Sequence, residues 1–177
     1  GGARRARHDG PGLRVRRGVR VAVDVGSVRV GVARSDPDGI LATPVETVAR
    51  TDRDDGTARI AAIVSELEAL EVIVGLPQSL DGKNRKAAGL ARTYAKALAR
   101  LVAPIPVRML DERFTSASAH RAMTASGLPA RSQRAVVDQV AAVIVLQQAL
   151  DTERTTDREP GQLVLAGATA VKDATRD

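Results

Sequence analysis

The chain has 177 residues, enough for one α/β domain with a sizeable hydrophobic core. It contains no cysteine, which excludes disulfides and thiolate metal sites, and its longest apolar run, residues 140–146, is too short to cross a bilayer. The formal net charge is +6, but residues 1–20 contain seven arginines and one acid, so the remainder is formally neutral. We therefore expect a basic, disordered arm over residues 1–18 of a cytoplasmic protein.

The first predicted elements form an antiparallel meander. Two strands within residues 19–36 are joined at Gly26 and Ser27, where we expect a hairpin turn with the glycine supplying an unusual φ angle. Residues 40–48 predict a third strand, which Pro44 places at the edge of the sheet because proline cannot donate to a neighbouring strand.

Helices and strands then alternate. The pattern predicts a helix near residues 60–67, a buried strand at 72–75, a helix over 83–102 and a strand at 107–110. A short helix capped by Thr115 or Ser116 and a long helix over 132–150 follow, and residues 151–177 are expected to be a polar tail. The sequence thus predicts an α/β domain over residues 19–150, with a mixed five-stranded sheet flanked by helices.

A carboxylate, Asp24, interrupts the apolar run of the first strand. Alternation places Ala22 and Asp24 on one face and Val21, Val23 and Val25 on the other. An unpaired carboxylate on a buried face is costly, so Asp24 requires a partner or a cation. The alternative is that Asp24 caps the following turn through its backbone.

Two further acidic positions stand at structurally unusual places. Asp111 and Glu112 end a predicted strand directly before Arg113, which is also compatible with a simple polar strand exit. Asp138 lies about two turns into a predicted helix that begins at Ser132, on a stripe of small residues. A helix-dipole role is the alternative, although that effect fades after the first turn.

Acids that converge from separate elements form a site of hard oxygen ligands. Such a site suits Mg²⁺ or Mn²⁺ and suits zinc poorly. Carboxylates holding two such ions about 4 Å apart are an arrangement that hydrolyses phosphodiester bonds.

Basic residues concentrate between Lys83 and Arg113, where Asp111 and Glu112 are the only acids. This segment is either a phosphate-facing surface or a solvated helix face. Only two aromatic residues, Tyr94 and Phe114, occur in the chain, which argues against a base-stacking platform for single strands.

Four blocks, in this order, resemble the YqgF/RuvX family: VAVDVGSVRVGVARSD, VIVGLPQSLDG, LDERFTS and VDQVAAVIVLQ. The resemblance covers about residues 19–150. It implies an RNase H-like fold related to Holliday-junction resolvases and a nuclease that matures the 5′ end of precursor 16S rRNA. It also implies a metal-dependent endonuclease that uses Mg²⁺ or Mn²⁺, with two ions expected.

The resemblance assigns the catalytic and metal-binding acids to Asp24, Glu112 and Asp138. Successive strand side chains point to opposite faces, so Asp111 and Glu112 do not both aim at one ion, and the resemblance selects Glu112. The matched loop runs through Gly75, Leu76, Pro77, Asp81 and Gly82, whereas Lys83 stands where the family often has a small hydroxyl residue. Expected substrate contacts are Lys83, Arg85, Lys86, Arg113, Thr115 and Ser116.

Two other functions remain open at this point. One is a catalytically silent RNase H-like module that only binds nucleic acid. The other is an actin/Hsp70-like nucleotide-binding lobe, which would require a second lobe. The expected partner is nucleic acid, either pre-rRNA, with possible contact to ribosomal precursor particles, or branched DNA, and the protein is expected to be a monomer or a homodimer.

Overall fold

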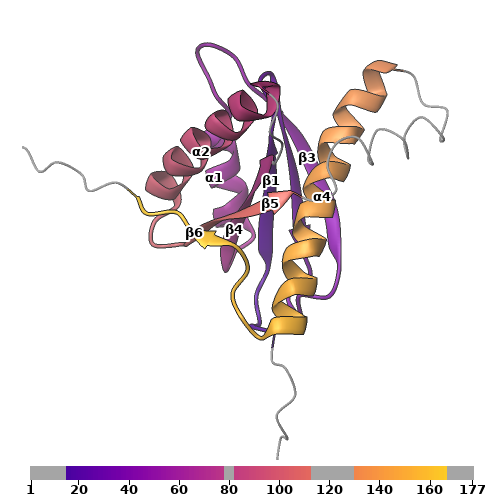
Figure 1. Ribbon diagram of the computed structural model, residues 1–177, viewed down its shortest axis with the longest axis vertical. Coiled ribbons are helices and arrows are strands. Elements are labelled where there is room, and N and C mark those ends of the chain that lie inside the picture. The colour runs from indigo at the N-terminus through magenta and orange to yellow at the C-terminus, as the bar shows by residue number, and fades with distance from the viewer. Residues whose placement is uncertain (1–14, 78–81, 113–129, 167–177) are drawn as a thin grey trace, which may run out of the picture.

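The computed structural model describes residues 15–77, 82–112 and 130–166 (Figure 1). Its elements, in chain order, are β1 (Arg20–Val25), β2 (Arg29–Ser35), β3 (Ala42–Ala49), α1 (Thr57–Glu66), β4 (Glu71–Pro77), α2 (Gly82–Val102), β5 (Val107–Glu112), α4 (Ala130–Thr156) and β6 (Gln162–Leu163). Among the described residues, no helix is both long and apolar enough to span a membrane.

One mixed sheet has the strand order β3-β2-β1-β4-β5-β6. β1, β2 and β3 pair antiparallel, whereas β4 lies parallel to β1 and β5 lies parallel to β4. The predicted meander and the edge position of the strand containing Pro44 are therefore confirmed. A bulge in the β2–β3 ladder pairs Val32 with Glu46 and Ala33 with Pro44.

The two faces of the sheet carry different side chains. α1 and α2 cover a face of valines from β1, β2 and β4, packed against residues such as Ile60, Ile63 and Leu98. α4 covers the other face, where Ala22 and Ala33 are fully buried. A Cβ at Gly31 would overlap with the backbone of Asp138, so the glycine allows α4 to lie directly on β2. The close approach places Asp138 over the face that also holds Asp24.

The β1–β2 turn differs from the prediction in one respect. Gly26 donates its N–H to the carbonyl oxygen of Arg29 at 2.8 Å, which closes the hairpin as expected. Its φ is not positive, however, so the prediction of a special backbone conformation was wrong. A Cβ at Gly26 would lie 2.7 Å from the Arg29 oxygen, so glycine is required for space rather than for φ.

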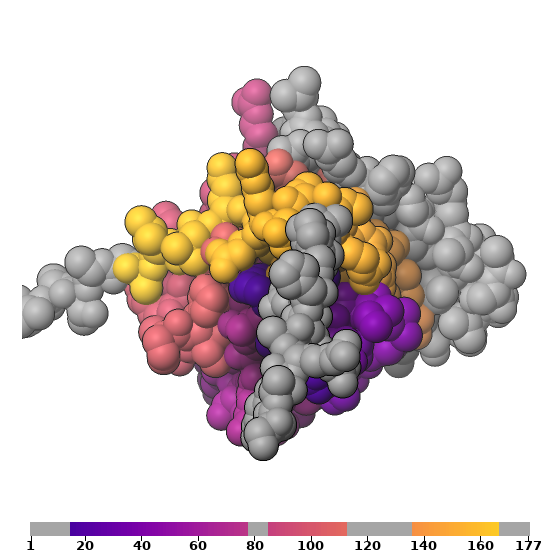
Figure 2. All heavy atoms as spheres, turned by 90° about the horizontal axis from the view of Figure 1, so that it is seen from below, coloured from indigo at the N-terminus to yellow at the C-terminus, as the bar shows by residue number. Residues whose placement is uncertain are grey.

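The sheet has six strands rather than five, because β6 pairs antiparallel with β5 through Met109 and Gln162. α4 also continues to Thr156, so the expected tail from residue 151 includes helix and strand. At the other terminus, residues 15–18 of the expected arm are described, and Arg16 bonds to Glu153. Figure 2 shows residues of the C-terminal part, in orange and yellow, beside the indigo atoms of the first described residues.

Candidate active site

Asp24 and Glu112 meet at the ends of parallel strands. β4 lies between β1 and β5, and the side chain of Glu112 occupies the space over Gly75 of β4, where a Cβ would overlap with its Oε1. Glu112 is 6% exposed and Asp24 is half-buried. The glycine in the middle strand therefore lets the glutamate reach toward Asp24.

No arginine, lysine or histidine of the described residues forms an ion pair with either carboxyl group. Burial, the charge and hydrogen bond of Glu112, and the charge of Asp138 hold the pKa of Asp24 well above its ordinary value. Burial also raises the pKa of Glu112, and its hydrogen bond with Asp24 only partly opposes this. Glu112 Oε1 is buried with no hydrogen-bond partner in the described part of the chain. A cation bound at this position would stabilise the buried oxygen, which otherwise lacks a partner.

Asp138 approaches the pair but is held by an arginine. Arg29 Nε donates to Asp138 Oδ2 at 2.7 Å, and the two side chains are 35% and 19% exposed. Within residues 15–77, 82–112 and 130–166, no three acidic or histidine side chains gather closely enough to hold a metal ion. The third predicted acid is thus near the site, and Arg29 neutralises its charge.

The donor set fits a hard divalent ion. Asp24 and Glu112 offer carboxylate oxygens only, and Glu112 Oε1 lies over Gly75 of β4 with no hydrogen-bond donor among the described residues. Oxygen donors of this kind select Mg²⁺ or Mn²⁺ over zinc. Asp138 can join them as a ligand through Oδ1 while Arg29 holds Oδ2, or through both oxygens if Arg29 releases it.

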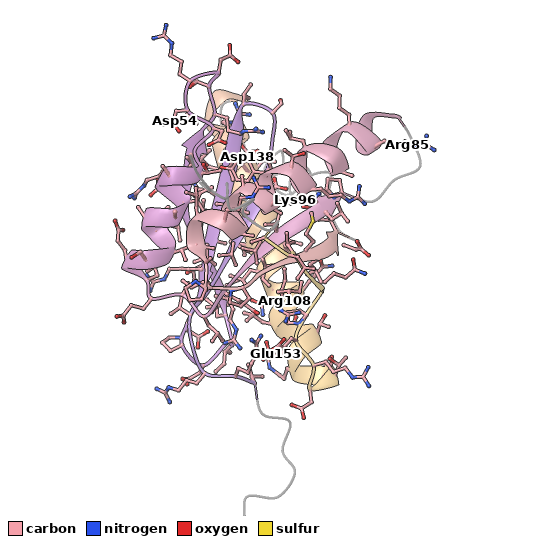
Figure 3. The ribbon with its side chains drawn as sticks, turned by 90° about the vertical axis from the view of Figure 1, so that its left-hand side faces the viewer. Asp54, Arg85, Lys96, Arg108, Asp138 and Glu153 are labelled. Atoms are coloured by element: carbon pink, nitrogen blue, oxygen red, sulfur yellow. The ribbon has the colours of Figure 1, made fainter. Side chains whose placement is uncertain are left out.

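The predicted substrate-binding residues are placed unevenly. Arg85 and Lys86 are exposed on α2, and Arg85 lies near the start of that helix, away from the sheet (Figure 3). Lys83 lies in the first turn of α2, but its side chain is outside the described part. Arg113, Thr115 and Ser116 also lie outside the described residues. The structure thus brings Asp24 and Glu112 together, with Asp138 beside them, and leaves the loop contacts as predictions.

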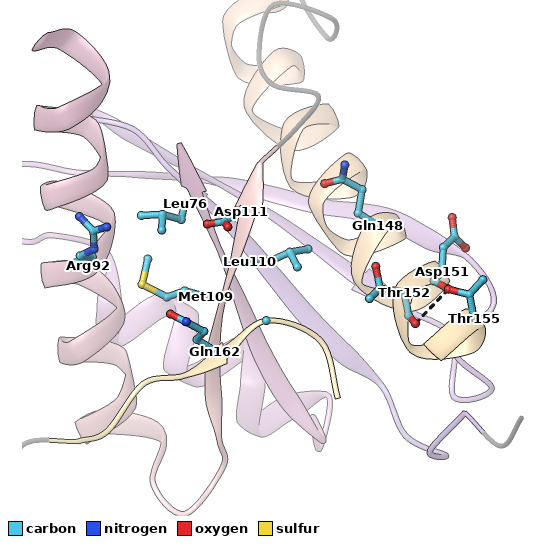
Figure 4. Close-up of a pocket in the computed structure, with 11 residues that line it drawn as sticks. Leu76, Arg92, Met109, Leu110, Asp111, Gln148, Asp151, Thr152, Thr155 and Gln162 are labelled. Atoms are coloured by element: carbon cyan, nitrogen blue, oxygen red, sulfur yellow. Dashed lines mark hydrogen bonds between the residues drawn. The ribbon is translucent and has the colours of Figure 1, made fainter. Parts of the chain in front are cut away.

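Asp111 points away from the acidic pair. It is exposed, and it lines a groove of about 770 Å³ at the open edge of β5 (Figure 4). The groove reaches from Arg92 on α2 across the strand to Gln148 and Thr152 on α4. The neighbours Asp111 and Glu112 therefore occupy different environments, as alternation along a strand requires.

Sequence reasoning missed Arg29 and did not foresee why Gly75 matters. Arg29, Gly31 and Ala33 alternate along β2, which places all three on the face that α4 covers. That alternation could have placed Arg29 on this face, but it could not have identified its partner Asp138, which is 109 residues away in the chain. Gly75 has no local signal for its role, since the clash it avoids is with a residue of another strand.

Comparisons with known proteins identify close relatives. A family profile described as "RuvX: Holliday junction resolvase" matches residues 18–152. A Streptomyces coelicolor protein is 52% identical over 154 residues, covering 87% of this chain and 91% of its own length. A Thermobifida fusca protein is 55% identical over 159 residues, covering 85% and 98%. Both carry the name of a pre-16S rRNA nuclease as a provisional assignment.

A solved structure shares the fold. The Thermus thermophilus RuvC protein, solved in complex with a Holliday junction substrate, aligns with a TM-score of 0.53 at 13% identity, covering 83% of this chain and 99% of that one. The similarity confirms the predicted RNase H-like architecture of a mixed sheet flanked by helices.

Proposed function

Because the chain belongs to the RuvX family, we propose that it is a hydrolase that cleaves phosphodiester bonds in structured nucleic acid. The observation that carries the proposal is the pair of a half-buried Asp24 and a buried Glu112, whose pKa values are raised and which have no basic partner among the described residues. Two carboxylates that repel each other in a folded protein cost stability, and a divalent ion would turn that repulsion into attraction. A purely structural pair would be expected to have a basic partner.

Asp24 and Glu112 would hold Mg²⁺ or Mn²⁺, and Asp138 would complete a site for a second ion. Ions bound there supply the charge that activates water and stabilises the oxygens of an in-line displacement. Arg29 would then exchange its bond to Asp138 for another partner, such as a substrate phosphate. Gly75 leaves room for the Glu112 carboxylate, and Gly31 lets α4 approach β2, which brings Asp138 close to the pair.

The substrate we propose is the 5′ region of precursor 16S rRNA, with branched DNA as the alternative. The names of the relatives support the first, and the description of the family supports the second. In this role the protein acts in the cytoplasm, on free pre-rRNA or on ribosomal precursor particles, as a monomer or a homodimer. Lys83, Arg85, Lys86, Arg113, Thr115 and Ser116 would contact the phosphate backbone of the substrate.

The direct test compares purified wild type with D24N and E112Q on two labelled substrates, a pre-16S rRNA fragment and a four-way DNA junction. Each is incubated with Mn²⁺ and with excess EDTA, and D111N serves as the matched control because it removes an adjacent but exposed acid. We expect metal-dependent cleavage by wild type and D111N and none by D24N or E112Q. Cleavage in EDTA, or equal activity in D24N, would refute the proposed chemistry.

One observation favours a second function, a module that binds nucleic acid without cleaving it. Arg29 already supplies the positive charge beside Asp138, and the described residues contain no three-acid cluster. If this arrangement persists when metal is added, wild type should bind both substrates in Mn²⁺ and cleave neither.

A further inference from the structure

Helix α2 has an unusual charge composition. Its 21 residues include six basic side chains and no acid. The residues that it buries are apolar, and they include Ala91, Ala95 and Leu98. All of the charge described on this helix therefore lies on its outer side.

The basic residues share one face. At 100° per residue, the five described ones fall within roughly 120° of the helix circumference. They are Arg85, Lys86, Arg92, Lys96 and Arg100, all exposed, and we refer to them as the α2 basic face. Gly89 lies within the same sector, and a Cβ there would meet no atom within 4 Å, so the helix surface is open at its centre.

No described acid neutralises the α2 basic face. None of its five side chains forms an ion pair within the described residues, whereas Arg16, Arg20, Arg59, Arg108 and Arg154 all do. Lys96 is four residues from both Arg92 and Arg100, and like charges at this spacing destabilise a helix. An ordinary solvated face would instead mix the two signs of charge.

We propose that the α2 basic face is a second nucleic-acid contact, which binds the phosphate backbone of a duplex segment away from the cleavage site. The proposal rests on the proposed nuclease function. Fifteen residues separate Arg85 from Arg100, so the face is about 22 Å long at 1.5 Å per residue. One strand of a duplex presents about six phosphates over that length, at about 3.4 Å of axial rise each.

The position of α2 separates this contact from the acids. α2 packs on the valine face of the sheet, whereas Asp24 and Glu112 lie on the face that α4 covers. Asp24 and Glu112 lie at the ends of β1 and β5, so nucleic acid that touches both surfaces must pass over that end of the sheet or around its β5 side. On the β5 side, Arg92 borders the groove, but the groove also carries Asp111 and Asp151, which repel phosphates, so we place the backbone along α2 rather than in the groove.

The chemistry of the face favours a backbone contact over base reading. Tyr94 is the only aromatic residue of α2, and it is 3% exposed, so no ring is available for stacking on unpaired bases. Arginine and lysine contacts to phosphates position a substrate without reading its sequence.

The test is the salt dependence of binding, measured by fluorescence anisotropy in EDTA so that no cleavage is needed. The triple variant R92Q/K96Q/R100Q is compared with R34Q/R53Q/R158Q, which also loses three exposed positive charges without a described ion pair. Probes are labelled RNA and DNA duplexes of about 20 base pairs and the matching single strands. Melting curves confirm that both variants are folded.

For duplex DNA we expect the slope of log K against log salt to fall by about 2.7 in the α2 variant, at about 0.9 per lost phosphate contact. The control variant should change this slope much less. With the RNA duplex, the α2 variant should again lose more of its slope than the control variant. An unchanged slope in the α2 variant, an equal loss in the control, or a loss confined to single strands would overturn the proposal. Binding is measured without metal, so this experiment tests the α2 basic face even if the protein proves inactive in the cleavage assay. Conversely, unchanged binding by the α2 variant would leave the cleavage assay a valid test of the nuclease function.

Discussion

Two groups of buried acids lie at opposite ends of the same sheet. Asp24 and Glu112 lie where β1 and β5 end, and Glu71 and Glu153 lie near the start of β1 and β4. Glu71 is fully buried and Glu153 is 3% exposed. Figure 3 shows the separation, with Asp138 toward one end and Glu153 toward the other.

The second group is surrounded by arginines. Arg16 bonds to Glu71 and Glu153 at 2.9 Å, Arg20 bonds to Glu153 at 3.2 Å, and Arg108 lies 3.4 Å from Glu71. Burial opposes ionisation of Glu153, but bonds from Arg16 outweigh it and lower its pKa. These contacts tie residues near both ends of the described chain to the sheet.

The presence of arginine partners separates structural acids from functional acids in this protein. Burial costs both groups solvation, but among the described residues only the Glu71 and Glu153 group has arginines that compensate for it. Burial raises the pKa of Glu71 as well as the pKa values of Asp24 and Glu112, so the difference lies in the partners: Arg16 and Arg108 lie beside Glu71, whereas no described arginine or lysine pairs with Asp24 or Glu112. Buried acids with raised pKa values and no described basic partner are typical of sites that bind a ligand or perform chemistry. Burial alone would not distinguish the two groups.

Removing a structural acid should have the largest effect. In E153Q, Arg20 keeps its buried charge and loses its carboxylate, and breaking one side of such a pair costs roughly 3–5 kcal/mol. We expect that loss in the free energy of unfolding, measured by urea denaturation, with cleavage per folded molecule unchanged. A stability change below about 1 kcal/mol would mean that the network contributes little.

Removing a functional acid should show the reverse pattern. D24N and E112Q should lower the cleavage rate by at least about 100-fold, since even residues that only support metal ligands are worth 10–100-fold. Their melting temperatures without metal should stay equal or rise, because repulsion within the pair is relieved. A large destabilisation in D24N would place Asp24 among the structural acids.

Replacing Arg29 should have a smaller effect, and it tests whether Asp138 belongs with the functional acids. R29Q frees Asp138, and because the pair is partly exposed the loss of stability without metal should be at most about 1 kcal/mol. The rise in melting temperature caused by Mn²⁺ should become larger than in wild type, because Asp138 can then bind the ion. An unchanged Mn²⁺ effect in R29Q would show that Asp138 does not contribute a ligand.

The smallest effect is on the pH dependence of stability. Because the pKa of Asp24 is raised on folding, the native state binds more protons than the unfolded state above about pH 4. Its contribution to stability is therefore full below that pH and is lost as pH rises through the folded pKa. D24N should flatten this decline in metal-free unfolding curves, whereas an unaltered profile would contradict the raised pKa.

Local patterns predicted much of the fold. The alternation of residues 21–25, the edge position of Pro44 and the strand at 72–75 depend on neighbours in the chain, and the structure confirms each of them. β6 was missed because two exposed residues, Gln162 and Leu163, carry no periodic signal. The sequence predicted a glycine at position 26 for its φ angle, whereas the structure requires it for space beside Arg29. A glycine in a turn looks the same in the sequence in both cases.

The site was less accessible to sequence reasoning. Alternation placed Asp24 correctly beside Ala22, but it could not choose between Asp111 and Glu112, and only the family resemblance did so. The arginine partners decide which buried acids are structural, and they come from distant segments: Arg29 and Asp138 are 109 residues apart, and Arg16 and Glu153 are 137 apart. Such contacts depend on the assembled sheet and not on any local pattern.

The central claim is that Asp24 and Glu112 form a cation site, and its most direct test is Mn²⁺ binding measured by isothermal titration calorimetry. Wild type, D24N, E112Q and E153Q are titrated under conditions where all four are folded. We predict binding by wild type and E153Q and its loss in D24N and E112Q. Equal Mn²⁺ binding by wild type and D24N would contradict the account.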